Sequence, residues 1–313
     1  MKIAITGASS FIGTHLLSSY RANEHEINVL SRKPLQVLPE NVTSFRGDLL
    51  DSACLEGFVK DCDVVVNLVY LWDADCKQNL QAIENLAKVC AAAGVKRLVH
   101  CSSSSVYGGV KEVVIDEKTA CLPITEYACT KMAIEELLMK KFSGELEIII
   151  LRPTQVFGPG GKNLLKLIHD LSHKTKFKNY LKSCLLSQRK MNLVYIENVI
   201  EALYFLMTKK DLQFNTYVIS DDEDYSNEFK NVESLIKAEL NIQESKIPHL
   251  FLPLFFYTAI YKIISKGNIH PRASFINLNL KQEGFKKPVH FKEGLKNFLN
   301  WYKYENIKCK SID

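Results

Sequence analysis

The sequence lacks the cysteine patterns of a disulfide framework or of a metal site. Its nine cysteines include no CxxC pair, and none stands at metal-ligand spacing from any of the eight histidines. Most of the cysteines lie in apolar or helix-like surroundings, where a reduced thiol packs as a small apolar side chain. We therefore expect no metal site, and reduced, buried thiols of the kind found in a cytoplasmic protein.

A strong excess of charge is also missing. Forty basic and 35 acidic side chains leave a net charge of +5 over 313 residues, which does not indicate a nucleic-acid partner. This balance is compatible with an enzyme whose small-molecule substrate carries phosphate.

Long apolar runs are absent as well. The most apolar window, FLPLFFYTAIYKII at 251–264, is too short to cross a bilayer and contains Pro253. It predicts a buried helix or the wall of a substrate pocket, so we expect no membrane partner. The first strand-like run begins at Lys2, which leaves no room for a signal peptide.

What the sequence does contain is an alternation of strand-like and helix-like segments. The strand-like runs are KIAIT, INVLS, SFRGD, VVVNLV, RLVHCSS and LEIIILRP, and helical patterns separate most of them. Alternation of this kind predicts an α/β fold with a parallel sheet covered by helices on both faces, a Rossmann-like doubly wound arrangement.

The character of the sequence changes after the run GPGG that ends at residue 161. We expect a dinucleotide-binding domain over 1–160, to which 190–210 returns. The segments 161–189 and 211–313 would form a smaller C-terminal substrate lobe. The basic stretch HKTKFKNYLK in that lobe is more typical of a solvated face than of a phosphate site.

The opening segment MKIAITGASSFIG predicts a turn that binds a pyrophosphate. A glycine at the end of the strand permits a tight turn, and Gly13 lets the following helix pack close to the sheet. Unpaired amides at a helix N-terminus attract phosphate. The residues that would cradle it are Gly7, Ser10, Phe11, Ile12 and Gly13. The alternative is an ordinary strand, turn and helix without a ligand.

The end of the second strand, INVLSRKP, predicts which dinucleotide binds. NAD-binding sheets place an acidic side chain here to bond the adenosine ribose, whereas this chain has Ser31, Arg32 and Lys33. A guanidinium grips a 2′-phosphate with paired hydrogen bonds, so Arg32 favours NADP(H), with NAD as the alternative. The alternative interpretation is that Arg32 and Lys33 are only two exposed cations near a turn, without a ligand. Asp48 and Leu49 close the third strand, where the aspartate would bond the adenine amino group.

A serine-ended strand and a tyrosine–lysine helix predict the chemistry. RLVHCSSSSVYG ends in serines, and Tyr127 and Lys131 stand one helical turn apart in ITEYACTKMAIEELL. A nearby ammonium lowers the pKa of a phenol and suits it for proton exchange. A serine hydroxyl facing both groups would hold the substrate's carbonyl or alcohol oxygen. A glycine turn, a serine-ended strand and a Tyr–Lys helix in this order are together a specific signal for such a catalytic site. The alternative interpretation is that Tyr127 and Lys131 are only an exposed pair on a helix.

These motifs resemble those of the extended short-chain dehydrogenase/reductase family, often labelled NAD-dependent epimerase/dehydratase. The resemblance spans nearly the whole chain. It rests on TGASSFIG, GDL, VVNLV, Asn79, VKRLVHCSSSSVYG, YACTK, LRPTQVFGPG, VYIENV and EGLKNFLNWY. It implies that Ser103 is the catalytic serine, that Tyr127 is the acid/base and that Lys131 orients the nicotinamide ribose.

The resemblance also implies substrate contacts and an oligomeric state. The candidate substrate-binding residues are Ser103, Ser104, Tyr127, Gln155 and Arg189. Similar proteins pair the helices that begin near Asn79 and Tyr127 into a four-helix contact, so we expect a homodimer.

Several positions depart from the family pattern. Val69 and Tyr70 replace small residues after the fourth strand, which would narrow the site near the nicotinamide. Members that dehydrate sugars carry an acidic pair where this chain has Ser104 and Ser105, so elimination would lose its acid and base.

Two further departures concern the substrate lobe. Met191 stands where sugar-nucleotide members often place an arginine, with Arg189 and Lys190 just upstream. Asn198 replaces a common aspartate.

The leading hypothesis is an NADP(H)-dependent oxidoreductase that moves hydride to or from a carbonyl or alcohol of a nucleotide-linked sugar. An NAD-dependent nucleotide-sugar 4-epimerase would use the same serine, tyrosine and lysine. A non-catalytic dinucleotide-sensing regulator is an alternative of another class. A reductase of an apolar substrate, such as a steroid or flavonoid, is the fourth possibility.

Overall fold

A parallel sheet organises the chain. The computed structural model describes residues 1–33, 38–173, 175–243 and 270–310. Seven strands lie in the order β10-β7-β5-β4-β1-β2-β3, and every neighbouring pair in this sheet is parallel. Their bounds are β1 Lys2–Thr6, β2 Glu26–Ser31, β3 Val42–Arg46, β4 Val64–Asn67, β5 Arg97–Cys101, β7 Glu147–Pro153 and β10 Thr216–Ile219. The predicted Rossmann-like class is confirmed.

The strand order reverses between β1 and β4. From β1 the chain builds β2 and β3 on one side, then returns to place β4, β5 and β7 on the other. Ligands of open α/β sheets bind at such a switch point, outside the carboxyl ends of the strands. The fold therefore directs attention to the ends of β1 and β4.

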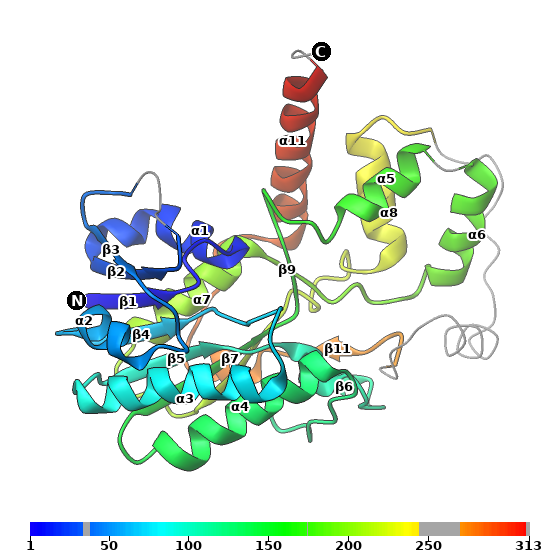
Figure 1. Cartoon of the computed structure of the whole chain (residues 1–313). Coiled ribbons are helices and arrows are strands. Elements are labelled where there is room, and N and C mark those ends of the chain that lie inside the picture. Colours follow the sequence, from blue (N-terminus) through cyan, green and yellow to red (C-terminus); the bar gives the residue numbers. More distant parts are fainter. Residues whose placement is uncertain (34–37, 174, 244–269, 311–313) are drawn as a thin grey trace.

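Helices cover both faces of the sheet (Figure 1). On one face lie α2 (Leu55–Val59), α3 (Cys76–Ala92) and α4 (Glu126–Phe142), and on the other lie α1 (Phe11–Ser18) and α7 (Ile196–Thr208). The strand side chains alternate between these faces: Ile3 and Ile5 enter the core beneath α1 and α7, whereas Ala4 enters the core beneath α3 and α4. Because both faces are buried, the inner strands are mostly apolar, whereas the edge strand β3 is partly exposed and mostly polar.

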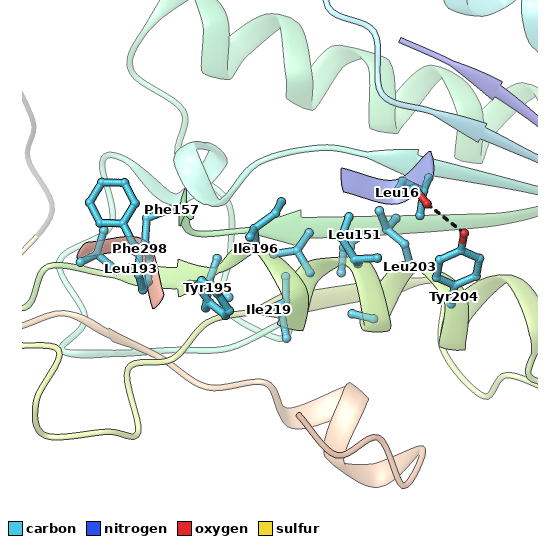
Figure 2. Close-up of a cluster of buried hydrophobic side chains, with 14 of the residues drawn as sticks. Leu16, Leu151, Phe157, Leu193, Tyr195, Ile196, Leu203, Tyr204, Ile219 and Phe298 are labelled. Carbon is cyan, nitrogen blue, oxygen red and sulfur yellow. Dashed lines mark hydrogen bonds between the residues drawn. The ribbon is translucent and has the colours of Figure 1, made fainter. Parts of the chain in front are cut away.

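Figure 2 shows the core on the α1 and α7 face. Leu151 and Ile219 from the sheet meet Ile196 and Leu203 from α7, and all four are fully or almost fully buried. Burial of each such side chain stabilises the fold by about 1.5–3 kcal/mol. The Tyr204 hydroxyl donates a hydrogen bond of 3.1 Å to the Leu16 carbonyl oxygen, which ties α7 to α1.

Four further helices lie beyond the sheet. α5 (Leu165–His173), α6 (Lys176–Leu186) and α8 (Phe229–Glu239) are grouped together, and α11 (Phe291–Lys310) rises beside them (Figure 1). The remaining elements are short: β6 Val114–Ile115 pairs with β11 Ser274–Phe275, β8 Gln155–Phe157 pairs with β9 Leu193–Tyr195, and α10 spans Leu278–Gln282. Three 3-10 turns also lie within the described residues: η1 Tyr20–Glu24, η2 Ser52–Cys54 and η3 Ser104–Tyr107.

One strand of the main sheet comes from the segment expected to form the substrate lobe. β10 lies within 211–313, the segment assigned to the substrate lobe, yet it pairs with β7 as an edge strand of the main sheet. Its run of four residues, TYVI, is too short for the sequence pattern alone to distinguish it from the strands of a separate lobe.

Within the described ranges, no helix has the length and apolarity needed to cross a membrane. The apolar window at 251–264, predicted to be a buried helix or a pocket wall, lies outside the described residues.

Candidate active site

A cleft of about 680 Å³ runs along the carboxyl ends of the strands. It crosses the switch point between β1 and β4, the position at which this fold is expected to hold a ligand. The residues that line it come from the turn after β1, the ends of β2, β3, β4, β5 and β7, and the beginning of α4. Among them are Gly7, Ser10, Ile12, Arg32, Asp48, Leu49, Ser103, Tyr127 and Lys131.

Two glycines shape the turn at the middle of the cleft. Gly7 has φ +76°, a conformation that side chains other than glycine rarely adopt. A Cβ placed on Gly13 would lie 2.2 Å from the Gly7 carbonyl oxygen, so only glycine lets α1 start this close to β1. The first amides of α1, which have no carbonyl partner within the helix, are thereby placed beside the cleft.

Ser10, which stands where the family pattern has a glycine, caps α1. Its hydroxyl oxygen accepts a hydrogen bond of 3.1 Å from the Gly13 amide, and the residue is extended, as an N-cap should be. The hydroxyl proton is still available to a phosphate oxygen. Phe11 points elsewhere, because its ring packs edge-on against His15 with 5.2 Å between centroids. Phe11 and Gly13 therefore serve the turn through their backbone and do not line the cleft.

The ends of β2 and β3 form one wall of the cleft. The Gly47 amide donates to the Ser31 carbonyl oxygen at 3.2 Å, which brings the two strand ends together. Asp48 accepts a hydrogen bond of 3.0 Å from the Leu50 amide, and this bond fixes its carboxylate at the wall. Arg32 is exposed, and no carboxylate among the described residues forms an ion pair with it. Its guanidinium is thus available to an anion.

Ser103, Tyr127 and Lys131 meet at the other end of the cleft. Ser103 follows β5, and its hydroxyl oxygen accepts a hydrogen bond of 3.1 Å from the Ser105 amide. Thr125 caps α4 by accepting from the Ala128 amide at 3.2 Å, which sets where the helix begins and so where Tyr127 points. The buried ammonium of Lys131 donates to the Cys101 carbonyl oxygen at 2.8 Å. Residues distant in the sequence are therefore brought together at this end of the cleft.

The pKa of Tyr127 differs from the sequence-based expectation of a lowered value. Burial raises it to about 12, and a hydrogen bond with Ser103 opposes that rise. The sequence shows the spacing of Tyr127 and Lys131 but not their burial, which dominates the pKa of Tyr127. The amine of Lys131 is also directed to a backbone carbonyl oxygen. Burial also lowers the pKa of Lys131. In this state the phenol is a proton donor at neutral pH.

A buried ion pair supports the end of the cleft that holds Ser103, Tyr127 and Lys131, the proposed catalytic end. The Arg152 guanidinium contacts both carboxylate oxygens of Glu135, with Nε at 3.1 Å from each, and also donates to the Tyr107 hydroxyl. The Ser102 hydroxyl donates to Glu135 as well. Glu135 lies one turn beyond Lys131 on α4, so the pair fixes this helix against β7 and against the residue next to Ser103.

A row of polar side chains lies across the strand ends on the α3 and α4 face. The Thr6 hydroxyl donates to the Asn67 side-chain oxygen at 2.6 Å, and the Asn67 amide group lies 2.8 Å from Nδ1 of His100. Nε2 of His100 is buried and has no hydrogen-bond partner in the described part of the chain. Burial, with the charge of Lys131, holds the pKa of His100 well below its ordinary value, so the ring is neutral.

Three predicted substrate residues are not among the residues that line this cleft. Ser104 lies in η3, Gln155 is exposed in β8, and Arg189 lies between α6 and β9, where its carbonyl oxygen accepts from the Phe229 amide at 2.9 Å. Their substrate contacts stay predictions. The cleft instead includes an aromatic pair, Tyr70 and Trp72, beside Tyr127. Only the aromatic run YLW after the fourth strand signals this pair in the sequence.

The fold and the cleft define a dinucleotide-binding enzyme of the Rossmann-like class. The sequence profile of the NAD dependent epimerase/dehydratase family matches residues 3–220. The chain belongs to this family, within the extended short-chain dehydrogenase/reductases, as the motifs predicted.

Curated relatives carry related names. The chain is 27% identical to a UDP-glucose 4-epimerase of Vibrio cholerae over 94% of this chain and 93% of that protein. It is 30% identical to an uncharacterized UDP-glucose epimerase of Bacillus subtilis, over 51% of this chain and 58% of that protein. A sterol-4-alpha-carboxylate 3-dehydrogenase of Candida albicans is 26% identical over 70% of each chain.

Solved structures share the fold. The Bordetella bronchiseptica enzyme WbmG, in complex with NAD and UDP, superposes with a TM-score of 0.76 at 20% identity, over 97% of this chain and 96% of that one. A UDP-glucose 4-epimerase of Thermotoga maritima with UDP-glucose gives 0.70 at 18% identity, over 98% and 100%.

Proposed function

We propose that this protein is an NADP(H)-dependent oxidoreductase that transfers hydride between the nicotinamide and a carbonyl or alcohol of a nucleotide-linked sugar. The observation that carries the proposal is the meeting of Ser103, Tyr127 and Lys131 at one end of a cleft whose other end holds the exposed Arg32. Glycine turns and the N-terminal amides of α1 lie between the two ends, where a pyrophosphate would sit.

The preference for NADP(H) rests on Arg32. A guanidinium forms paired, charge-assisted hydrogen bonds with a phosphate, and a 2′-phosphate is what distinguishes NADP(H) from NAD(H). The carboxylate that would bond the ribose hydroxyls of NAD is replaced here by Ser31 and Arg32. The wall residue Asp48 lies at the end of the next strand and would face the adenine.

The residues of the catalytic end have distinct roles in this proposal. The bound dinucleotide supplies or accepts the hydride. Ser103 orients the substrate oxygen, and Tyr127, protonated because its pKa is raised to about 12, gives that oxygen a proton during reduction. Lys131 is held by the Cys101 carbonyl oxygen beside the place of the nicotinamide ribose, which it would bond.

A nucleotide-sugar 4-epimerase is the second candidate. It is favoured by the similarity to the Vibrio cholerae UDP-glucose 4-epimerase over almost the full length of both chains. An epimerase returns the hydride to the other face of the sugar, regains its cofactor each cycle and needs no 2′-phosphate. Net cofactor consumption therefore separates the two candidates.

The test combines binding with product analysis. Thermal shifts with NAD and NADP report which cofactor stabilises the protein, since a ligand stabilises the state that it binds. Purified protein is then assayed with UDP-, dTDP- and GDP-sugars, following absorbance of the reduced nicotinamide and the products. Stoichiometric cofactor use supports the oxidoreductase, whereas epimer formation without net cofactor use supports the epimerase. Cofactor binding without turnover of any sugar supports the sensor or the apolar-substrate alternative.

Arg32→Ala tests the choice of cofactor, and Lys33→Ala is a matched control. Both residues are exposed cations after β2, but only Arg32 lines the cleft. We expect Arg32→Ala to weaken NADP(H) binding roughly tenfold to a hundredfold, the worth of hydrogen bonds to a charged group, with little change for NAD(H). Equal loss for both cofactors would contradict the assignment.

We also propose a homodimer and a cytoplasmic location. α3 and α4 lie side by side, and Lys141 on α4 pairs with Glu84 on α3 at 3.2 Å. The outer face of this helix pair is the proposed contact. Sedimentation over micromolar concentrations tests the dimer.

A further inference from the structure

Trp72 is an aromatic side chain left in solvent at the mouth of the cleft. Three quarters of its surface is exposed, although it lines the cleft and lies between β4 and α3. Single exposed apolar residues are common on protein surfaces, so exposure alone has no meaning. The arrangement of the rings around Trp72 is what needs explanation.

Three aromatic rings meet at the catalytic end. The Trp72 ring lies parallel to the Tyr127 ring, with an angle of 6° and 5.2 Å between centroids. Tyr70 stands across both, at 71° to Tyr127 with 4.8 Å between centroids and at 67° to Trp72 with 4.7 Å. The Tyr127 hydroxyl is hydrogen-bonded to the side chain of Ser103, so the phenol has a polar neighbour at its hydroxyl and aromatic neighbours at its ring.

The loop that carries the two rings is fixed by its own hydrogen bonds. Leu71, between Tyr70 and Trp72, donates from its amide to the Asn79 side-chain oxygen at 2.9 Å and accepts from the Asn79 amide group at 3.0 Å. Asn79 is buried in α3, and Asp75 caps that helix in a capping box with Gln78. The two rings are thus held before any ligand arrives, as recognition surfaces usually are.

We propose that Trp72, backed by Tyr70, is the surface on which the sugar ring of the substrate stacks beside Tyr127. This inference rests on the proposed function, and it names a specificity-determining residue for it. The C–H face of the sugar ring packs against the exposed face and edge of the Trp72 indole. The hydroxyl or carbonyl group that reacts faces Ser103 and the phenol.

The chemistry of a sugar ring matches these polar and aromatic neighbours. One face of a pyranose presents C–H bonds that carry small positive partial charges, and the face of an indole ring is negative because of its quadrupole. The hydroxyl groups at the rim of the sugar need hydrogen-bond partners, which Ser103 and the Tyr127 hydroxyl supply. A nucleoside diphosphate without a sugar would occupy the rest of the substrate site and leave Trp72 untouched.

The experiment uses this difference. Tyr127→Phe keeps the ring that stacks on Trp72 but blocks turnover, and Trp301→Phe removes the only other tryptophan of the chain. The double variant, saturated with the oxidised dinucleotide that it binds, is titrated with UDP and UDP-glucose, dTDP and dTDP-glucose, and GDP and GDP-mannose, while the fluorescence of Trp72 is followed. One of the three nucleotide pairs should bind. We expect its nucleotide sugar to change the emission of Trp72 and its nucleoside diphosphate to leave that emission unchanged.

Calorimetry with Trp72→Ala gives the second readout. We expect a roughly threefold to tenfold loss of affinity for the nucleotide sugar, the worth of an aromatic stack, and no loss for the diphosphate. Trp72→Phe should recover most of the affinity, and Trp301→Phe on α11 should bind both ligands as the parent does. Equal emission changes for the two members of a pair, or unchanged binding in Trp72→Ala, would overturn the stacking proposal alone. Failure of all six nucleotides to bind would overturn the proposed function together with it.

Discussion

The Lys131 ammonium donates a hydrogen bond to the Cys101 carbonyl oxygen at 2.8 Å, and so joins the second turn of α4 to the end of β5. Tyr127 lies one turn earlier on the same helix and is placed against Ser103 by this connection. The amine also lies 5.6 Å from the centre of the Tyr70 ring. Lys131 therefore organises this end of the cleft through the backbone.

Lys131→Met should consequently have two effects. The proposed contact with the nicotinamide ribose disappears, which raises the dissociation constant of the dinucleotide and lowers turnover. The Cys101 carbonyl oxygen loses a buried partner, which lowers the free energy of unfolding by about 1–3 kcal/mol. Cofactor titration and urea unfolding measure the two separately. Unchanged cofactor affinity would show that the role of Lys131 is structural.

Tyr127→Phe removes the proposed acid/base and little else. The ring that packs against Tyr70 and Trp72 is kept, so we expect the fold and the cofactor affinity to stay near those of the parent. Turnover should fall by about a hundredfold to ten-thousandfold, the usual contribution of general acid/base catalysis. Ser103→Ala should cost less, because a water molecule can replace part of its hydroxyl's role. A Tyr127→Phe enzyme that works at the parental rate on its substrate would end the dehydrogenase assignment.

The titration of Tyr127 should depend on the cofactor. In the free protein burial raises its pKa to about 12, so the phenol stays protonated through pH 9. The nicotinamide of an oxidised dinucleotide is cationic, and a cation beside a phenol favours the phenolate. We expect oxidised cofactor to produce tyrosinate absorbance near pH 9 in the parent but not in Tyr127→Phe. Equal spectra for the two proteins with cofactor would contradict this.

Much of the fold and part of the site can be predicted from the sequence, because both depend on local signals. Apolar strand runs and the turn residues Gly7 and Gly13 specify the parallel sheet and its opening turn. The spacing of Tyr127 and Lys131 places them on one helical face, and the preceding serines follow directly from the end of a strand.

What could not be predicted depends on tertiary contacts. The raised pKa of Tyr127 comes from burial, and the aromatic rings lie beside it only because Asn79 holds the loop that carries Trp72. Asn198 is another example. Its amide donates to Asp221 at 3.1 Å while its oxygen accepts from the Val289 amide at 3.1 Å, so an aspartate here would oppose a second carboxylate.

The Glu135–Arg152 pair should matter for stability far more than a surface pair. Both side chains are almost completely buried, so Glu135→Ala leaves a guanidinium without its counter-charge. Breaking a buried pair in this way typically lowers the free energy of unfolding by about 3–5 kcal/mol. Lys88→Ala is the control, because the Lys88 side chain is 60% exposed and its pair with Glu84 should contribute about 0–1 kcal/mol. Urea unfolding of both variants tests the contrast, and similar losses would contradict it.

Asp222 should make stability depend on pH in the direction opposite to that of most carboxylates. It lies three residues past β10 and accepts hydrogen bonds from the Asn192 side chain at 2.6 Å, the Asn227 side chain at 2.8 Å and the Phe275 amide at 2.9 Å. Burial nevertheless outweighs these bonds and raises the pKa of Asp222 to about 6. In the unfolded chain an aspartate has a pKa of about 3.9.

Between about pH 4 and pH 6, therefore, the folded protein holds a proton that the unfolded chain has released. The contribution of Asp222 to the free energy of unfolding falls as pH rises through this window, by roughly 1.4 kcal/mol per pH unit. The side chain of Asp222→Asn cannot titrate, so its free energy of unfolding lacks this dependence on pH. The variant also loses one acceptor oxygen, which destabilises it at every pH. Urea unfolding at pH 4.5 and pH 7 should show a larger advantage of the parent over Asp222→Asn at pH 4.5. An advantage that is constant, or that grows toward pH 7, would mean that this carboxylate is ionised in the fold across the whole range.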